Sequence, residues 1–147
     1  MLRSLAAQFP LLMDSLMPVD RNLRILLVDD QDTFLEIMRQ ILRQLGFRYV
    51  DEAKDGSKAM LALREAVDPY GLVISDWNME PMTGYELLKE VRADPGLTKT
   101  PFIMVTAESK TENVIAAKKA GVNNYIVKPF NAQTLKTKIE AVFAESA

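Results

Sequence analysis

The sequence contains neither cysteine nor histidine among its 147 residues. Without cysteine the chain can form no disulfide and no thiolate metal site, which fits a reducing compartment, and we expect a cytoplasmic protein. Without histidine it can form no Ser-His-Asp triad, no imidazole-ligated metal site and no phosphohistidine of its own. Any histidine chemistry in its function must therefore come from a partner.

Long hydrophobic runs and long basic blocks are also missing. No stretch approaches the roughly 20 consecutive apolar residues that span a bilayer, so we expect no membrane association. The net charge of −2 argues against binding to nucleic acid. With 48% apolar and 26% charged residues, the chain has the size and composition of one globular domain that buries its own core.

The first twenty residues differ from the rest of the chain. Apolar residues recur there at helical spacing, but Pro10 and Pro18 interrupt the pattern and charges are few. A secretory signal needs a basic start and an unbroken apolar core, so the interior Pro10 argues against one. Residues 1–20 are either a loosely ordered extension or a short amphipathic segment that docks on the domain or on a partner. The domain itself is predicted at residues 21–147.

From residue 23 onward, short apolar runs alternate with segments whose apolar residues recur every three or four positions. The runs predict buried strands at 23–28, 72–76, 102–106 and 125–127 and a shorter, more exposed strand at 47–53, and the segments after each of them predict five helices. This alternation is typical of an α/β domain with a doubly wound parallel sheet. Right-handed crossovers then collect the carboxyl ends of all strands at one edge.

Local signals predict where several helices begin and end. The segments Thr83–Glu86 and Ser109–Glu112 both match the capping-box pattern and predict helix starts. Gly46 and Gly121 are typical C-terminal caps. The apolar spacing of the second helix predicts that Val67 packs inward at its end.

Acidic, basic and hydroxyl side chains stand at the ends of four predicted strands. They are Asp29 and Asp30 after the first strand, Asp76 after the third, Thr106 at the end of the fourth and Lys128 after the fifth. Each alone has an ordinary explanation, since acids often start turns and a lysine is usually solvated. Ligands bind at the carboxyl edge of open parallel sheets, so the joint placement of these side chains predicts a functional site.

Three carboxylates brought close together repel one another unless a cation compensates their charge. Carboxylate oxygens without a histidine or cysteine ligand suit Mg²⁺ or Mn²⁺ rather than zinc. Magnesium keeps coordination positions open for phosphate oxygens, and a nearby lysine binds the same group as a point charge. Because a carboxylate can itself be the nucleophile that forms an aspartyl-phosphate, the predicted site is suited to phosphoryl transfer.

Five short motifs lie at these strand ends in a fixed order: Asp29-Asp30, Asp76-Trp77-Asn78-Met79, Thr106-Ala107-Glu108, Tyr125 and Lys128-Pro129-Phe130. Together they resemble the receiver domains of two-component response regulators, in particular the single-domain chemotaxis regulators. The resemblance covers about residues 23–143. It implies a flavodoxin-like fold, with a five-stranded sheet in the order 2-1-3-4-5 and five helices.

The resemblance also implies roles for the residues of the site. Asp76 is the expected phosphoacceptor, Lys128 the phosphate-binding cation and Thr106 a hydroxyl contact to a phosphoryl oxygen. In the family a cis peptide usually joins the lysine to the following proline, here Pro129. The expected Mg²⁺ ligands are Asp29, Asp30, Asp76 and the backbone carbonyl of Asn78.

A switch between two states is implied by the same likeness. In receiver domains the threonine moves towards the phosphoryl group and an aromatic residue on the fifth strand swings inward, here Thr106 and Tyr125. The small Ala107 leaves room for that motion, which one new charge is able to drive. The alternative for Tyr125 is a core aromatic without a switching role. Asn78 and Glu108 flank the acyl phosphate in the family and are expected to set its lifetime.

One residue departs from the family pattern. Receiver domains usually carry a proline directly after the methionine of the third-strand loop, whereas here Glu80 occupies that place and Pro81 follows. The departure bears on the loop geometry that would place the carbonyl of Asn78 on the metal. We hypothesise that Glu80 approaches Lys128 or the metal in the unphosphorylated state and tunes the affinity for Mg²⁺.

The resemblance implies a signalling switch that promotes only its own phosphorylation and dephosphorylation, and is not otherwise an enzyme. A histidine kinase is the expected phosphodonor, a phosphatase is a further candidate partner, and we expect a monomer. The expected output is binding of a flagellar motor switch protein, or of another effector, to the face of the fourth helix, fifth strand and fifth helix. That face includes Val114, Tyr125, Val127 and Lys138. A phosphate sink or relay is the alternative function within the family.

Two classes of protein outside the family stay open. A haloacid-dehalogenase-type phosphatase also combines a nucleophilic aspartate, a threonine, a lysine and Mg²⁺. The segment Asp30-Gln31-Asp32 matches its Asp-x-Asp start, although Phe34 stands where that class has a threonine. A non-phosphorylated interaction module would leave the complete set of acids and Lys128 unexplained.

Overall fold

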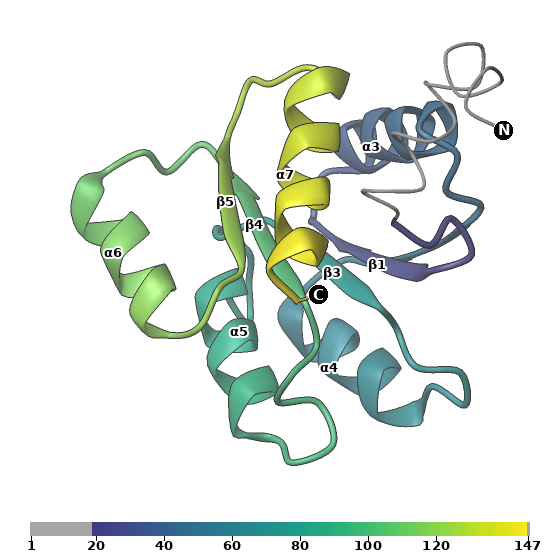
Figure 1. Ribbon diagram of the computed structural model, residues 1–147. Coiled ribbons are helices and arrows are strands. Elements are labelled where there is room, and N and C mark those ends of the chain that lie inside the picture. Colours follow the sequence, from purple (N-terminus) through teal and green to yellow (C-terminus); the bar gives the residue numbers. More distant parts are fainter. Residues whose placement is uncertain (1–18, 147) are drawn as a thin grey trace, which may run out of the picture.

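The computed structural model describes residues 19–146, and Figure 1 gives their arrangement. The predicted extension at residues 1–20 lies almost wholly outside the described residues, so both interpretations of it stay predictions. Val19, the first described residue, is buried in the hydrophobic core. No helix within the described residues is long and apolar enough to cross a membrane.

Five parallel strands form the sheet in the order β2-β1-β3-β4-β5, as predicted. They are β1 (Arg24–Val28), β2 (Tyr49–Ala53), β3 (Leu72–Ser75), β4 (Phe102–Thr106) and β5 (Asn124–Val127). The register pairs the last residue of β1 with that of β3, Val28 with Ser75, and the last residue of β4 with that of β5, Thr106 with Val127. The loops that follow these strands therefore meet at one edge.

Helices cover both faces of the sheet (Figure 1). On one face lie α3 (Asp32–Gln44) and α7 (Ala132–Ser146). On the other lie α4 (Gly56–Glu65), α5 (Gly84–Ala93) and α6 (Thr111–Lys119). This is the doubly wound arrangement that the alternation of strands and helices predicts.

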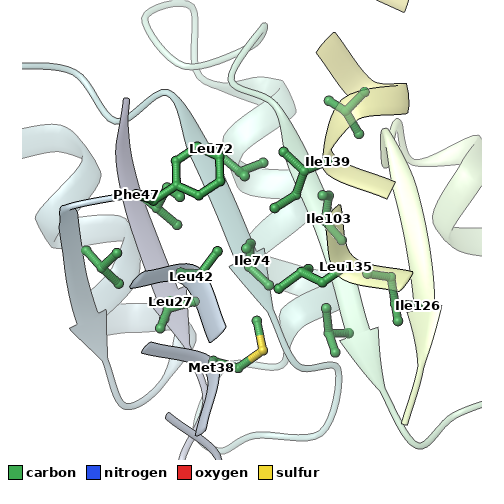
Figure 2. Packing of buried hydrophobic residues seen from close by; sticks show 14 of the residues in the cluster. Leu27, Met38, Leu42, Phe47, Leu72, Ile74, Ile103, Ile126, Leu135 and Ile139 are labelled. Atoms are coloured by element: carbon green, nitrogen blue, oxygen red, sulfur yellow. The ribbon is translucent and has the colours of Figure 1, made fainter. Parts of the chain in front are cut away.

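Alternate residues of the strands enter two separate cores. In β1, Ile25 and Leu27 pack towards α3 and α7, whereas Leu26 and Val28 pack towards α4 and α5. Figure 2 shows the first core, where Leu27 from the sheet and Leu135 from α7 are both buried. Burying one such side chain contributes about 1.5–3 kcal/mol, so short strands packed on both faces hold their carboxyl ends firmly in place.

Several helix ends follow the sequence signals. The backbone N–H of Glu86 donates to Thr83 Oγ1 (3.1 Å), and the N–H of Thr83 donates to the Glu86 carboxylate (2.9 Å), which confirms the first capping box. Gly46 and Gly121 have φ values of +98° and +100° just after α3 and α6. The left-handed conformation predicted for these two caps is therefore confirmed.

The capping box predicted at Ser109 is wrong. Helix α6 begins at Thr111, and its N-cap is Lys110, which makes no capping hydrogen bond through its side chain. Glu108 organises this turn instead, because its carboxylate accepts a hydrogen bond from Asn113 Nδ2 (3.0 Å). The helix therefore begins one residue later than the local pattern predicts, and Glu108, which precedes it, contacts its first turn.

The inward position predicted for Val67 is also wrong, since this side chain is 96% exposed. Helix α4 ends at Glu65, and the backbone is already extended at Ala66. The carbonyl of Asp68 accepts a hydrogen bond from Arg24, which ties the segment after α4 to the sheet. Because Pro69 disfavours helix at the residue before it, the chain leaves the helix before Val67 can pack.

Candidate phosphoryl-transfer site

Backbone hydrogen bonds deliver the predicted site residues to the carboxyl edge. The N–H of Asp29 donates to the Ala53 carbonyl (3.1 Å), and the N–H of Asp76 donates to the Val28 carbonyl (2.9 Å). These bonds extend the ladders from β1 to β2 and from β3 to β1 by one residue. Each carboxylate therefore emerges at a fixed height above the sheet.

Asp29, Asp30 and Asp76 lie together, as the parallel topology predicts. One carboxylate oxygen from each lies within 4.8 Å of the others. Asp29 and Asp76 are buried, at 2% and 9% exposure, and Asp30 is exposed. Two ligands on opposite sides of Mg²⁺ lie about 4.2 Å apart, so this all-oxygen cluster could hold a hard divalent cation.

Lys128 completes the charged group. Its ammonium nitrogen lies 3.1 Å from Asp29 Oδ2 and 3.6 Å from Asp76 Oδ2. The N–H of Lys128 donates to the Thr106 carbonyl (2.9 Å), which fixes the backbone from which this side chain reaches across the edge. The same ammonium lies 3.7 Å from the centre of the Phe34 ring, a cation–π contact that leaves its open side towards the carboxylates.

The pKa of Asp29 is raised above its usual value, first because the carboxyl group is buried and also because Asp76 is near. The N–H of Gln31, which donates to Asp29 Oδ1 (2.9 Å), and the ammonium of Lys128 lower this pKa but do not cancel the effect of burial. The pocket therefore disfavours negative charge. A bound cation would relieve that penalty.

Short-range contacts fix the carboxylate of Asp76. The backbone N–H of Trp77 donates to Asp76 Oδ1 (2.7 Å), and the hydroxyl of Ser75 donates to the Asp76 carbonyl (2.9 Å). Gly84, the first residue of α5, packs so closely that a Cβ there would lie 1.8 Å from the carbonyl oxygen of Asp76. The close approach of α5 thus requires glycine at this position.

The predicted switch residues lie on the same side of the site. Thr106 is fully buried, and its hydroxyl accepts a hydrogen bond from the N–H of Glu108 (3.3 Å), while Ala107 is exposed. Tyr125 points inward at 8% exposure, and its hydroxyl donates to the Glu108 carbonyl (2.7 Å). Burial, together with the charges of Glu108 and Asp76, raises the pKa of Tyr125 to about 12.

Asn78 and Glu108 face one another across the mouth of the site, where Asn78 Nδ2 lies 3.4 Å from Glu108 Oε1. Glu80 is exposed and lines a surface hollow together with Asp30 and Asn78. Within the described residues Glu80 forms no ion pair, and Lys128 pairs with Asp29 and Asp76. The hypothesised approach of Glu80 to Lys128 is therefore absent from this structure.

The surface predicted for partner binding is only partly exposed. Val127 of β5 is 40% exposed, whereas Val114 of α6 and Lys138 of α7 are partly buried and Tyr125 is buried. Ile115 of α6, which sequence reasoning did not assign to this surface, is 47% exposed. Val127 and Ile115 supply the exposed apolar area on these two elements.

Three aromatic contacts of the site were not predicted from the sequence. The ring of Phe34 contacts the ammonium of Lys128, and nothing in the spacing of Phe34 along its helix indicates this contact. Tyr85 stacks on Trp77 with ring centres 4.9 Å apart and planes inclined by 2°. Trp77 also makes an edge-type contact with Tyr125, with ring centres 6.5 Å apart. The position of Tyr85, two residues after the N-cap Thr83, does not predict that its ring stacks on Trp77.

Fold and site together define a doubly wound α/β domain with a carboxylate cluster and a lysine at the carboxyl edge of its sheet. Residues 25–140 match the family described as response regulator receiver domain, and the chain belongs to that family. The predicted resemblance, including its likeness to the single-domain chemotaxis protein CheY, is confirmed. The chain is 46% identical over 125 residues to chemotaxis protein CheY-3 of Vibrio cholerae serotype O1, covering 85% of this chain and 95% of that protein. It is 48% identical over 121 residues to chemotaxis protein CheY of Pseudomonas aeruginosa, covering 82% and 96%.

Solved structures agree with the fold. The chemotaxis response regulator CheY4 of Vibrio cholerae superposes with a TM-score of 0.75 at 33% identity, covering 82% of this chain and 98% of that chain. A response regulator receiver domain protein from Clostridium thermocellum gives a TM-score of 0.74 at 26% identity, covering 84% and 97%. The flavodoxin-like fold is therefore confirmed.

Proposed function

We propose that this protein is a phosphorylation-dependent signalling switch in which Asp76 accepts a phosphoryl group from a histidine kinase. The observation that carries the proposal is the position of the Lys128 ammonium, 3.1 Å from Asp29 and 3.6 Å from Asp76, beside three carboxylates that could share one cation. A purely structural ion pair would need only one carboxylate beside Lys128, and a turn would need no lysine at all. Phosphoryl transfer needs this combination of positive charge and an acidic cation site.

In the proposed reaction a carboxylate oxygen of Asp76 attacks the phosphorus of a phosphohistidine. The bond from the histidine nitrogen to phosphorus breaks, and the nitrogen leaves with the electron pair. Asp29, Asp30, Asp76 and the carbonyl of Asn78 would hold Mg²⁺, which neutralises charge on the phosphoryl oxygens when bound. The ammonium of Lys128 would then exchange its ion pairs with the carboxylates for hydrogen bonds to the oxygens of the transferred phosphoryl group.

The proposed output depends on Thr106 and Tyr125. A phosphoryl oxygen that attracts the Thr106 hydroxyl removes it from the Glu108 N–H, and the loop that holds the Tyr125 hydroxyl changes with it. An equilibrium between two positions of Tyr125 with a gap of a few kcal/mol is enough for one new charge to shift the populations. Tyr125 is buried in this structure, and we propose that this inward position is the one that phosphorylation favours.

We further propose that the switch acts in chemotaxis, in the cytoplasm, with a flagellar motor switch protein as the partner on α6, β5 and α7. Support comes from the names of relatives at 46% and 48% identity, which are chemotaxis proteins, and from the exposed apolar side chains Val127 of β5 and Ile115 of α6. A phosphate sink or relay remains the alternative output. Binding of a motor switch peptide that depends on phosphorylation separates the two.

The decisive experiment is incubation with acetyl phosphate, or with a phosphorylated kinase, with and without Mg²⁺. We expect stoichiometric labelling that needs Mg²⁺ and is lost in Asp76→Asn, while Asp68→Asn, at the opposite edge of the sheet, labels normally. Labelling that survives in Asp76→Asn would reassign the acceptor. Repeated turnover of a small phosphate ester would instead indicate a phosphatase.

A further inference from the structure

The hollow beside the carboxylate cluster contains a residue that the proposed reaction does not use. Glu80 lies in the loop between β3 and α5 and lines, with Asp30, Asn78, Met79 and Thr83, a hollow of about 370 Å³. Asp30 belongs both to this hollow and to the carboxylate cluster, so the hollow opens onto the proposed cation site. A fourth acidic side chain therefore lines the approach to that site.

The charge of Glu80 is not compensated at short range. Among residues 19–146, Glu80 forms no ion pair, and the Thr83 hydroxyl beside it is engaged with Glu86 (3.1 Å). The ammonium of Lys128 is paired with Asp29 and Asp76, not with Glu80. The negative potential of the Glu80 carboxylate consequently acts on any ion that enters the hollow. It attracts a cation and repels an anion.

We propose that Glu80 is an electrostatic anchor for the hydrated divalent cation, which raises cation affinity while it repels small anionic phosphodonors. The inference rests on the proposed function of the site and deepens it. A carboxylate at the rim accepts hydrogen bonds from waters that Mg²⁺ retains, because magnesium dehydrates reluctantly. The same negative charge opposes the approach of acetyl phosphate, whereas a protein phosphodonor brings its own complementary surface.

The test compares wild type, Glu80→Gln, Glu80→Asp and the control Glu65→Gln, an exposed glutamate at the far end of α4. Mg²⁺ affinity is measured by Trp77 fluorescence and in parallel by calorimetric titration. We expect Glu80→Gln to weaken Mg²⁺ binding about two- to fivefold at low ionic strength, with a smaller effect at high salt. Glu80→Asp should retain most of the affinity, and Glu65→Gln should equal wild type.

The second measurement is the rate of phosphate uptake from acetyl phosphate at saturating Mg²⁺. Here Glu80→Gln should be about two- to fivefold faster than wild type, since the repulsion of the donor is removed. Damage to the loop would instead lower both cation affinity and uptake rate.

The possible outcomes separate the two proposals. No Mg²⁺ binding to the wild-type protein by either method would overturn the proposed function itself. Wild-type binding with an unchanged affinity in Glu80→Gln would overturn only the inference about Glu80. A loss of both affinity and uptake that is insensitive to salt would assign Glu80 a role in loop geometry and would also overturn the electrostatic one.

Discussion

Replacing Asp29 with asparagine is expected to stabilise the protein when no divalent cation is present. Asp29 is 2% exposed, and its raised pKa means that burial outweighs the Lys128 ion pair and the Gln31 N–H. The asparagine oxygen can still accept the hydrogen bond from Gln31, and Lys128 keeps Asp76 as a partner at 3.6 Å. The substitution therefore removes a buried charge without leaving another charge unpaired.

The expected gain is about 1 kcal/mol, since single stabilising substitutions, including optimisation of charges, commonly contribute about 0.5–2 kcal/mol. In a domain of this size that corresponds to a rise in Tm of roughly 3–5 °C. Mg²⁺ at about 100 times its Kd would stabilise the wild-type protein by about 2.7 kcal/mol. The variant lacks one proposed ligand, so saturating Mg²⁺ should reverse the order of stability.

The pH dependence of this gain gives an independent check. The folded-state pKa of Asp29 lies above its usual value of 3.8, so ionised Asp29 destabilises the fold at neutral pH. As the pH falls through the raised pKa, Asp29 of the folded wild-type protein takes up a proton. The free-energy penalty of burying its charge then disappears. The advantage of Asp29→Asn should be full at pH 7, shrink through that window and vanish below about 3.8.

The assay is urea or thermal unfolding of wild type, Asp29→Asn and the control Asp68→Asn, in EDTA and in Mg²⁺, at several pH values. A variant that is less stable than wild type in EDTA at pH 7 would refute the burial argument. Equal stabilisation of wild type and variant by Mg²⁺ would refute the assignment of Asp29 as a ligand.

Three further substitutions test the surroundings of the site. Thr83→Ala should lower the free energy of unfolding by about 1 kcal/mol, because the α5 capping box is lost, as measured by urea denaturation; an unchanged midpoint would contradict this. Gly84→Ala should destabilise by about 1–3 kcal/mol and slow phosphate uptake, since the new Cβ displaces the Asp76 carbonyl, and normal uptake kinetics would count against that contact. Tyr85→Leu should change the emission of Trp77 and Tyr85→Phe should restore it, because the stack needs only the ring; identical spectra would exclude the stack.

The alternation of apolar runs and helical periodicity was enough to predict the sheet, its helices and the edge at which Asp29, Asp76 and Lys128 meet. Their convergence follows from topology alone, because parallel strands share one carboxyl edge. Contacts that depend on how a helix sits against that edge could not be predicted. The ring of Phe34 lies under Lys128 only because α3 packs at a particular position over the sheet.

The wrong details have the same origin. The capping pattern at Ser109 satisfies every local requirement, yet Glu108 bonds to Asn113 and α6 starts later. The equivalent pattern at Thr83 forms both hydrogen bonds of the capping box. Local patterns thus predict helix ends only where tertiary contacts agree with them.

The order of the strands has a consequence for how the protein matures. Asp29 and Lys128 are 99 positions apart, and β3 and β4 lie between the strands that carry them. Contacts of such long sequence separation form slowly, because the entropy lost on closing the loop precedes the gain from the contact. A partly assembled copy that holds only β1 and β3 would possess the acids but lack the lysine from beyond β5. If the proposed function holds, the complete phosphoryl-transfer site would therefore exist only once the last strand of the sheet has joined.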